Sequence, residues 1–347
     1  MNVNIQLQGL AKLQGSMTLE GSPFVYNIDL LNWINRLTSY NLPLPSDLVI
    51  FALNSFLNNL EKYGLRQKIK RLNLFCAGNW LGSFFPIIID VGNAWDYNGK
   101  YGVNPASLAS GSIQASDWSL TTGYNFISNA DYWPDANPGV TGNLSSNILK
   151  VIDTTYPENN ISLSNNSVHV SCFISDINNT SPIGTYCTDV GGDSTYFNFQ
   201  CAYNGNSADN NIVRFNCYTQ SLTDTAGGYL ETNTFSPQGF YIGSRVSTTL
   251  NTMYKNGYWQ NLSIAANGYN PNYNQIVSSP SSSSSTIILG GKTNGSNIPS
   301  GSNRVVNNVT DRTYSMYSIG TGLTDTEALI FNNIVVNFNT TIGRANY

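Results

Sequence analysis

The sequence predicts a mainly β protein: a two-sheet antiparallel jelly-roll sandwich with a short helical N-terminal region and a C-terminal capping helix. Three observations lead to this fold class. Short strand-like segments separated by turn residues recur from about residue 70 to residue 320. Two segments with apolar residues at helical spacing come before these strand-like segments, and one comes after them. The chain has no internal repeat, which disfavours a propeller or a solenoid.

The composition allows a large core and excludes some partners. The chain has 347 residues, of which 41% are hydrophobic and 10% charged, compared with about 25% charged in typical soluble proteins. The net charge is −4, and the densest basic cluster is Arg66, Lys68, Lys70 and Arg71. Nucleic-acid binding needs many Lys and Arg contacts to phosphate, so we expect no nucleic-acid partner.

The apolar segments and the cysteines indicate core packing. Residues 72–90 form the most apolar window, but Asn73, Asn79 and Pro86 interrupt it, so we expect core strands and no membrane insertion. The N-terminus lacks the basic start and apolar stretch of a signal peptide. The five cysteines are widely spaced and odd in number, which favours buried thiols over a disulfide framework.

Three regions follow one another along the chain. Residues 1–26 alternate apolar and polar side chains, as in a strand that docks to another protein or forms an oligomer. Residues 27–68 contain two helical patterns, the first capped by Asp29 and the second by Ser46 or Asp47. Residues 69–347 form the jelly roll. A disordered N-terminal segment is the alternative for residues 1–26.

The sandwich strands show period-two alternation and tight turns. Val168, Val170 and Cys172 alternate with polar residues in "SVHVSCFIS", and further strands follow with the same pattern. In "YKNGYW", Asn256 and Gly257 tolerate positive φ, so this stretch predicts a tight hairpin.

The final helix, residues 324–342, has a clear start and end. Thr324 is the predicted N-cap, and Glu327 stands three residues later, which is the capping-box spacing. Gly343 is placed to end the helix. One apolar stripe runs along it, formed by Phe331, Ile334, Val335, Phe338 and Ile342. Because Asn, Thr and β-branched residues are poor helix formers, we expect burial against the sandwich or the N-terminal helices to stabilise it.

Several of these segments, in this order, resemble the laminin-G-like (concanavalin A-like lectin/glucanase) jelly-roll domains of tailed-bacteriophage virion structural proteins. They are "LEKYGLRQKIKRLNLF" before the sandwich, "FYIGSRVS", "MYKNGYW" and "IILGG" within it, and "GLTDTE" at the start of the closing helix. The resemblance covers roughly residues 46–344. It implies the fold and a virion setting, but it does not by itself imply a ligand.

The resemblance leads to a hypothesis on function. We expect a non-enzymatic virion surface protein, such as a tail fibre, a head fibre or a capsid decoration subunit, that is assembled in the host cytoplasm. Its partners would be other virion proteins, contacted through the N-terminal segment, and copies of itself, with a trimer expected by analogy. The alternatives are a carbohydrate-binding module that recognises host surface glycans and, less favoured, a glycan-cleaving enzyme.

The titratable residues offer little chemistry. Glycosidases need two carboxylates that flank the scissile bond, and no two of the five glutamates are two or four residues apart. The single histidine, His169, is out of phase with the apolar residues of its strand, and we expect a satisfied structural side chain. No zinc-ligand cluster is present, and only "DVGGDS" (189–194) offers a weak calcium option. The sequence therefore predicts no catalytic residue, no metal and no cofactor.

Aromatic residues in amide-rich segments are the better lead for ligand binding. Such segments can stack a ring on a sugar face and bond its hydroxyl groups, although core packing and subunit interfaces use the same residues. The candidate glycan-binding residues are Trp95, Tyr97, Tyr132, Trp133, Tyr258 and Trp259.

Overall fold

The computed structural model describes residues 25–78, 82–98, 140–141, 152–157, 167–176, 190–191, 197–204, 210–217, 238–247, 250–259, 286–290, 292–293, 306–307 and 313–344. All structural statements below concern these ranges. The predicted N-terminal strand therefore lies outside them except for its last residues.

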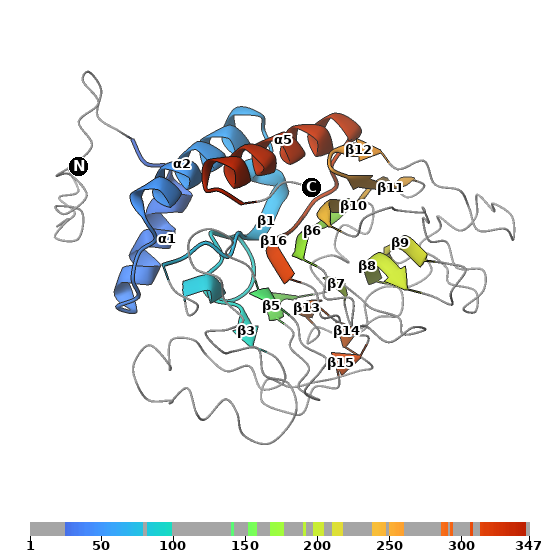
Figure 1. Cartoon of the computed structure of the whole chain (residues 1–347), viewed down its shortest axis with the longest axis horizontal. Helices are drawn as coiled ribbons and strands as arrows, with labels where there is room; N and C mark the ends of the chain where they lie inside the picture. Colours follow the sequence, from blue (N-terminus) through green and yellow to red (C-terminus); the bar gives the residue numbers. More distant parts are fainter. Residues whose placement is uncertain are drawn as a thin grey trace, which may run out of the picture.

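Three long helices lie together on one side of the molecule (Figure 1), and we call them the helical layer. They are α1 (Ile28–Ser39), α2 (Asp47–Lys62) and α5 (Asp325–Thr341). Helices α2 and α5 run side by side, and the rings of Phe56 and Phe338 meet at 5.6 Å between centroids. Two short 3-10 helices are η2 (Arg66–Lys68) and η3 (Gly82–Phe84).

An antiparallel eight-stranded sheet lies against the helical layer. Its strand order is β12-β11-β10-β6-β16-β1-β2, with β4 paired to β16. The strands are β1 (Ile69–Asn73), β2 (Ile88–Ile89), β4 (Val140–Thr141), β6 (Val168–Asp176), β10 (Gly239–Ser247), β11 (Leu250–Lys255), β12 (Tyr258–Trp259) and β16 (Thr313–Gly320).

A second, antiparallel six-stranded sheet has the order β3-β5-β13-β7-β8-β9. Its strands are β3 (Tyr97–Asn98), β5 (Ile152–Pro157), β7 (Val190–Gly191), β8 (Phe197–Asn204), β9 (Asn210–Cys217) and β13 (Thr286–Leu289). A short ribbon pairs β14 (Lys292–Thr293) with β15 (Val306–Asn307). The predicted fold class, mainly β with helices at both ends of the described chain, is confirmed.

The eight-stranded sheet separates two apolar cores, as the alternation along β6 shows. Val168, Val170 and Cys172 point to the core shared with the six-stranded sheet, which includes Phe199 of β8 and Ile287 of β13. We call this side the sandwich face. The other side, the helix face, packs Phe173, Phe240 and Ile242 against the apolar stripes of the helical layer. Period-two alternation thus places each strand's residues in two different cores.

The closing helix matches its prediction closely. Thr324 is the N-cap of α5, and its hydroxyl and the Glu327 carboxylate form the reciprocal bonds of a capping box. Leu323 and Ala328 are fully buried on either side of this cap. Gly343 follows the helix with φ +75°. The predicted apolar stripe is buried, which explains how a sequence of low helix propensity is held in this form.

One helix cap differs from its prediction. The N-cap of α1 is Asn27, whose side chain accepts a hydrogen bond from the backbone N–H of Asp29 at 2.9 Å. Asp29 lies in the first turn and pairs with Arg66 instead. The interpretation of Asp29 as the cap was wrong because a long-range partner, which local spacing cannot reveal, uses its carboxylate.

The remaining expectations can be checked within the described ranges. Ser46 is the N-cap of α2, and Gly64 after that helix has φ +70°. Asn256 and Gly257 form the tight turn between β11 and β12, both at positive φ. Cys76 and Cys172 are buried, as expected. No described helix is long and apolar enough to cross a membrane.

Candidate functional site

The most enclosed polar cluster joins β1 to the segment that follows β2. Arg71 of β1 and Asp96 form an ion pair in which both side chains are completely buried. Nη2 and Nε of Arg71 donate to Oδ1 of Asp96 at 2.8 and 3.1 Å. Burying two charges is expensive, so such a pair needs further hydrogen bonds around it.

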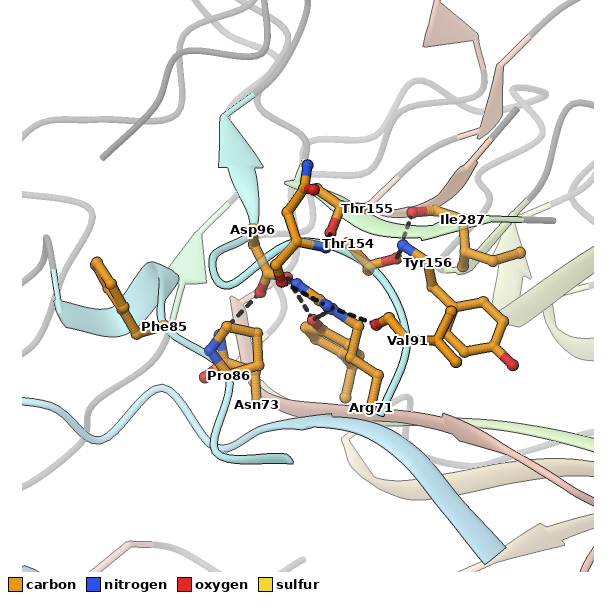
Figure 2. Close-up of polar contacts among 12 residues, drawn as sticks. Arg71, Asn73, Phe85, Pro86, Val91, Asp96, Thr154, Thr155, Tyr156 and Ile287 are labelled. Carbon is orange, nitrogen blue, oxygen red and sulfur yellow. Dashed lines mark hydrogen bonds and ion pairs between the residues drawn. The ribbon is translucent and has the colours of Figure 1, made fainter. Parts of the chain in front are cut away.

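Neutral partners supply those hydrogen bonds (Figure 2). The Tyr317 hydroxyl of β16 donates to Oδ1 of Asp96 at 2.6 Å, and Nδ2 of Asn73 donates to Oδ2 at 2.9 Å. Nη1 of Arg71 donates to the carbonyl oxygens of Val91 and Asn93, both at 3.0 Å. Both charged groups are thus surrounded by hydrogen-bond partners.

The local sequence explains how these groups meet. The register of β1 against β16 shifts between Ile69 and Arg71, so that Ile69 and Leu72 face the helices while Arg71 faces the sandwich core. Gly92 has φ +91°, and a Cβ there would lie 2.6 Å from the Thr155 carbonyl oxygen. Glycine therefore lets the segment pass close to β5, where the Asn93 N–H donates to Oγ1 of Thr155 at 2.9 Å.

The electrostatics of the cluster favour the paired state of Arg71. Burial alone lowers the pKa of Arg71, but its interactions with Tyr317 and Asp96 outweigh burial and raise that pKa. With its polar groups enclosed and bonded to one another, the cluster can hold the 91–96 segment against both sheets. Acid–base or nucleophilic chemistry would need a reactive group within reach of a substrate, whereas the side chains of Arg71 and Asp96 are both completely buried.

A second buried polar chain lies on the helix face. Nδ1 of His169 contacts the Thr321 carbonyl oxygen at 2.6 Å, and Nε2 contacts Oγ of Ser318 at 3.0 Å. Oγ of Ser318 contacts Oγ of Ser171 at 2.6 Å. Because a carbonyl only accepts, Nδ1 carries the proton and Nε2 accepts from Ser318. Burial lowers the pKa of His169 to about 4, so the ring is neutral near pH 7. The expectation of a satisfied structural histidine is confirmed.

The predicted aromatic candidates do not gather at one place within the described ranges. Trp95 is half-buried and packs against Tyr40, with ring centroids 5.8 Å apart, and against Phe85 at 6.3 Å. The backbone of Tyr97 pairs with that of Asp153 in β5. Tyr258 and Trp259 form β12, at the opposite edge of the eight-stranded sheet from β2. The side chains of Tyr97, Tyr258 and Trp259, the residues Tyr132 and Trp133, and the carboxylates of the calcium option lie outside the described parts.

Sequence patterns alone do not reveal the ion pair of Arg71 and Asp96 or its hydrogen-bond partners. Arg71 was noted only as part of a basic cluster, whose members all prove to be paired with carboxylates: Arg66 with Asp29 and Asp90, Lys68 with Glu327, Lys70 with Asp90, and Arg71 with Asp96. The available signal was an arginine within the apolar strand that contains Ile69 and Leu72. In the described parts, no group of three or more His, Cys, Asp or Glu side chains is placed to hold a metal.

No protein-family model matches the sequence, and no curated protein sequence matches it. Solved structures with some similarity include domain 4 of AbnA, an extracellular arabinanase from Geobacillus stearothermophilus, in complex with arabinotriose. It is 10% identical over 76% of this chain and 98% of that domain, with a TM-score of 0.34.

Two further solved structures are larger than the matched part. A mutant of Trypanosoma rangeli sialidase displaying trans-sialidase activity is 10% identical over 85% of this chain and 40% of that chain, with a TM-score of 0.38. The binding domain of Botulinum neurotoxin DC, in complex with rat synaptotagmin II, is 13% identical over 56% of this chain and 42% of that chain, with a TM-score of 0.33. At these values the similarity identifies no family for the chain.

Proposed function

We propose that this chain is a non-enzymatic structural protein on the surface of a tailed-bacteriophage particle. The helical layer would face the particle, and the sandwich would be displayed outward, where it could recognise a host surface glycan. The observation that supports this orientation is the distribution of exposed apolar side chains. In the described part of the chain, the large ones all belong to the helical layer or to the residues that flank its helices: Val25, Ile28, Leu48, Phe51, Tyr63 and Leu329.

Two of these side chains show how much apolar surface is exposed. Ile28, at the start of α1, is 61% exposed, and Leu48, at the start of α2, is 53% exposed. A single exposed apolar residue needs no explanation, but a group on one layer is typical of a surface that binds another protein. The six-stranded sheet lies on the side of the eight-stranded sheet that faces away from the helical layer (Figure 1).

Hydrogen bonds fix the start of the described chain to this surface. The Asn27 N–H donates to Oδ1 of Asn54 at 2.7 Å, and Nδ2 of Asn54 donates to the Val25 carbonyl oxygen at 3.2 Å. Nδ2 of Asn27 also donates to Oε1 of Glu61 at 2.9 Å. The entry into α1 thus runs along α2, so the described chain begins beside the exposed apolar side chains of Val25 and Ile28. This placement suits the attachment role that the sequence predicts for residues 1–26.

The polar groups described above support a framework role. The two most enclosed clusters, around Asp96 and around His169, hold strands and connecting segments together. The basic cluster before and within β1 is likewise engaged in ion pairs with helices and loops. These contacts stabilise the junction between the helical layer and the sandwich.

Incorporation into phage particles tests the proposed role. We expect the protein in purified particles of the phage that encodes it, and we expect Ile28→Ser with Leu48→Ser to lower its copy number, measured by quantitative mass spectrometry. The matched control is Asn32→Ser, which alters an exposed polar side chain of α1. Thermal unfolding midpoints of the isolated variants should stay close to that of the parent protein, because the side chains of Ile28 and Leu48 are both largely exposed.

Two outcomes would contradict this proposal. One is the absence of the protein from purified particles, and the other is an unchanged copy number in the double variant. Light scattering of the isolated chain tests the expected trimer separately, because a monomer at micromolar concentration would remove that analogy and leave the attachment proposal intact.

A further inference from the structure

The start of the described chain lies along one side of α2. Nδ2 of Asn27 donates to Oδ1 of Asn58 at 3.2 Å and to Oε1 of Glu61 at 2.9 Å, both in the second half of the helix. Two residues earlier, the Val25 carbonyl oxygen accepts a hydrogen bond from Nδ2 of Asn54 at 3.2 Å, in the middle of the helix. From Asn27 back to Val25, these contacts therefore move towards the start of α2.

Exposed apolar side chains continue this line on α2. Phe51 precedes Asn54 by three residues. Asn58 and Glu61 follow at spacings of four and three, so all of these residues share one stripe of the helix surface. Phe51 is 41% exposed, and Leu48, three residues before it, is 53% exposed. The polar half of the stripe binds the start of the described chain, and the half nearer the start of α2 is apolar.

Tyr26 shows that the chain already approaches the apolar half. Its ring is partly buried against the core of the helical layer. Burial and, after it, the negative charge of Asp47 raise the pKa of its hydroxyl. Because solvent screens a surface charge largely beyond about 10 Å, this hydroxyl lies near the first turn of α2.

The sequence immediately before Val25 suits an apolar surface. Residues 17–24 read "MTLEGSPF", with three large apolar side chains and one charged one. From Asn54 to Leu48 the helix rises about 9 Å. An extended chain spans that distance in about three residues. The segment is therefore long enough to reach the apolar half of the stripe, and it can pack there without burying more than one charge.

We propose that residues 17–24 pack on the first turns of α2 in the same chain and cover Leu48 and Phe51 until the protein attaches to its particle. The short tether at Val25 gives the segment a millimolar effective concentration beside this stripe, whereas a second copy is present at micromolar concentration. Contact within one chain is therefore favoured over exchange between copies. The inference deepens the proposed function, and only the release on attachment rests on it: the surface covered in the free protein is the one that would meet the particle.

Photo-crosslinking of the full chain tests where the segment lies. A benzophenone amino acid replaces Leu19, and mass spectrometry maps the cross-links after irradiation of the isolated protein. We expect them in residues 47–55 of the same chain. An equal mixture of nitrogen-14 and nitrogen-15 protein should give no cross-link between the two labels. On purified particles the yield of the same cross-link should fall several-fold.

Variants of the two apolar side chains test the docking surface. Leu48→Ser and Phe51→Ser, made singly in the benzophenone-labelled chain, should each lower the yield in residues 47–55 several-fold, because each removes a large apolar contact. Leu329→Ser is the matched control and should keep the parent yield. Leu329 on α5 is 39% exposed, nearly as much as Phe51, but lies beside Gly257 in the β11–β12 turn. Circular dichroism verifies folding, and Leu48→Ser decides the test if Phe51→Ser does not fold.

Four results would overturn the inference. Absent or scattered cross-links, or equal yields in Leu48→Ser, Phe51→Ser and the parent, would show that the segment does not pack on this stripe. Cross-links between the two labels would assign the stripe to a second copy. An unchanged yield on particles would exclude release on attachment. Because the main experiment uses the isolated protein, absence of the protein from particles would contradict the attachment proposal and leave the contact within the chain intact.

Discussion

The helix face and the sandwich face of the eight-stranded sheet bury polar groups in different ways. On the helix face, the deeply buried chain of His169, Ser318 and Ser171 is neutral. One ion pair on that side, between Lys68 and Glu327, lies at the rim with side chains that are 27% and 24% exposed. On the sandwich face, the ion pair of Arg71 and Asp96 is completely enclosed.

The difference shows that the two faces depend on different interactions. A neutral chain needs only hydrogen bonds, and the helix face derives its stability mainly from apolar packing. An enclosed ion pair adds little net stability, but removing one member leaves an uncompensated charge in the core. We therefore expect the sandwich face to be sensitive to one carboxylate and the helix face to be sensitive to pH and to its helix cap.

The largest expected effect comes from Asp96→Asn, which keeps the shape of the side chain and removes its charge. Arg71 would then be buried without a counter-ion, so the free energy of unfolding should fall by about 3–5 kcal/mol. Urea denaturation at pH 7 measures this loss. Asp90→Asn is the matched control: Asp90 pairs with Arg66 and Lys70 but is 31% exposed, so its loss should cost about 1 kcal/mol or less. Equal losses in the two variants would contradict the contrast between buried and rim charges.

A smaller effect is expected from protonation of His169 on the helix face. Its pKa is about 4 in the folded protein and about 6.5 in an unfolded chain. The folded state therefore binds this proton less readily, and stability falls as the pH decreases from about 6.5 towards about 4, by roughly 3 kcal/mol in total. Lys68 lowers the pKa of His169, and Glu327 and the Thr321 carbonyl raise it, but burial has the largest effect.

The variant His169→Asn isolates this contribution. Its amide nitrogen can replace Nδ1 as donor to the Thr321 carbonyl but cannot take up a proton. The free energy of unfolding, measured by urea denaturation between pH 4.5 and pH 7, should depend less on pH in the variant than in the parent. Parallel pH profiles for the two proteins would show that other groups cause the acid sensitivity.

The elements that could be predicted from sequence are those with local signals. The capping box at Thr324 and Glu327 and the Asn256–Gly257 turn were confirmed because the partners lie within a few residues of one another. The apolar stripe of α2 was confirmed because burial of one helix face leaves a 3.6-residue period in the sequence. Alternation likewise identified β6 and the out-of-phase position of His169.

The polar clusters could not be predicted because their partners are set by strand order. Asp96 and Tyr317 are separated by 221 residues and meet only because β16 lies beside β1. The same reason accounts for the error at Asp29, whose partner Arg66 is 37 residues away. The polar composition around Trp95 suggested a ring that binds a ligand. In the structure this ring packs on Tyr40 and Phe85. No sequence pattern near residue 95 indicates these contacts.

The smallest expected effect concerns the cap that begins α5. Thr324→Ala removes the hydroxyl that accepts a hydrogen bond from the Glu327 N–H, so the free energy of unfolding should fall by about 1 kcal/mol. Thr326→Ala is the control, because Thr326 is an exposed residue two positions into the same capped turn. Hydrogen exchange should become faster at the first turn of α5 in Thr324→Ala while it stays unchanged in β1. If both alanine variants lost the same stability, the capping box would contribute nothing, and packing against the helix face would alone determine where α5 begins.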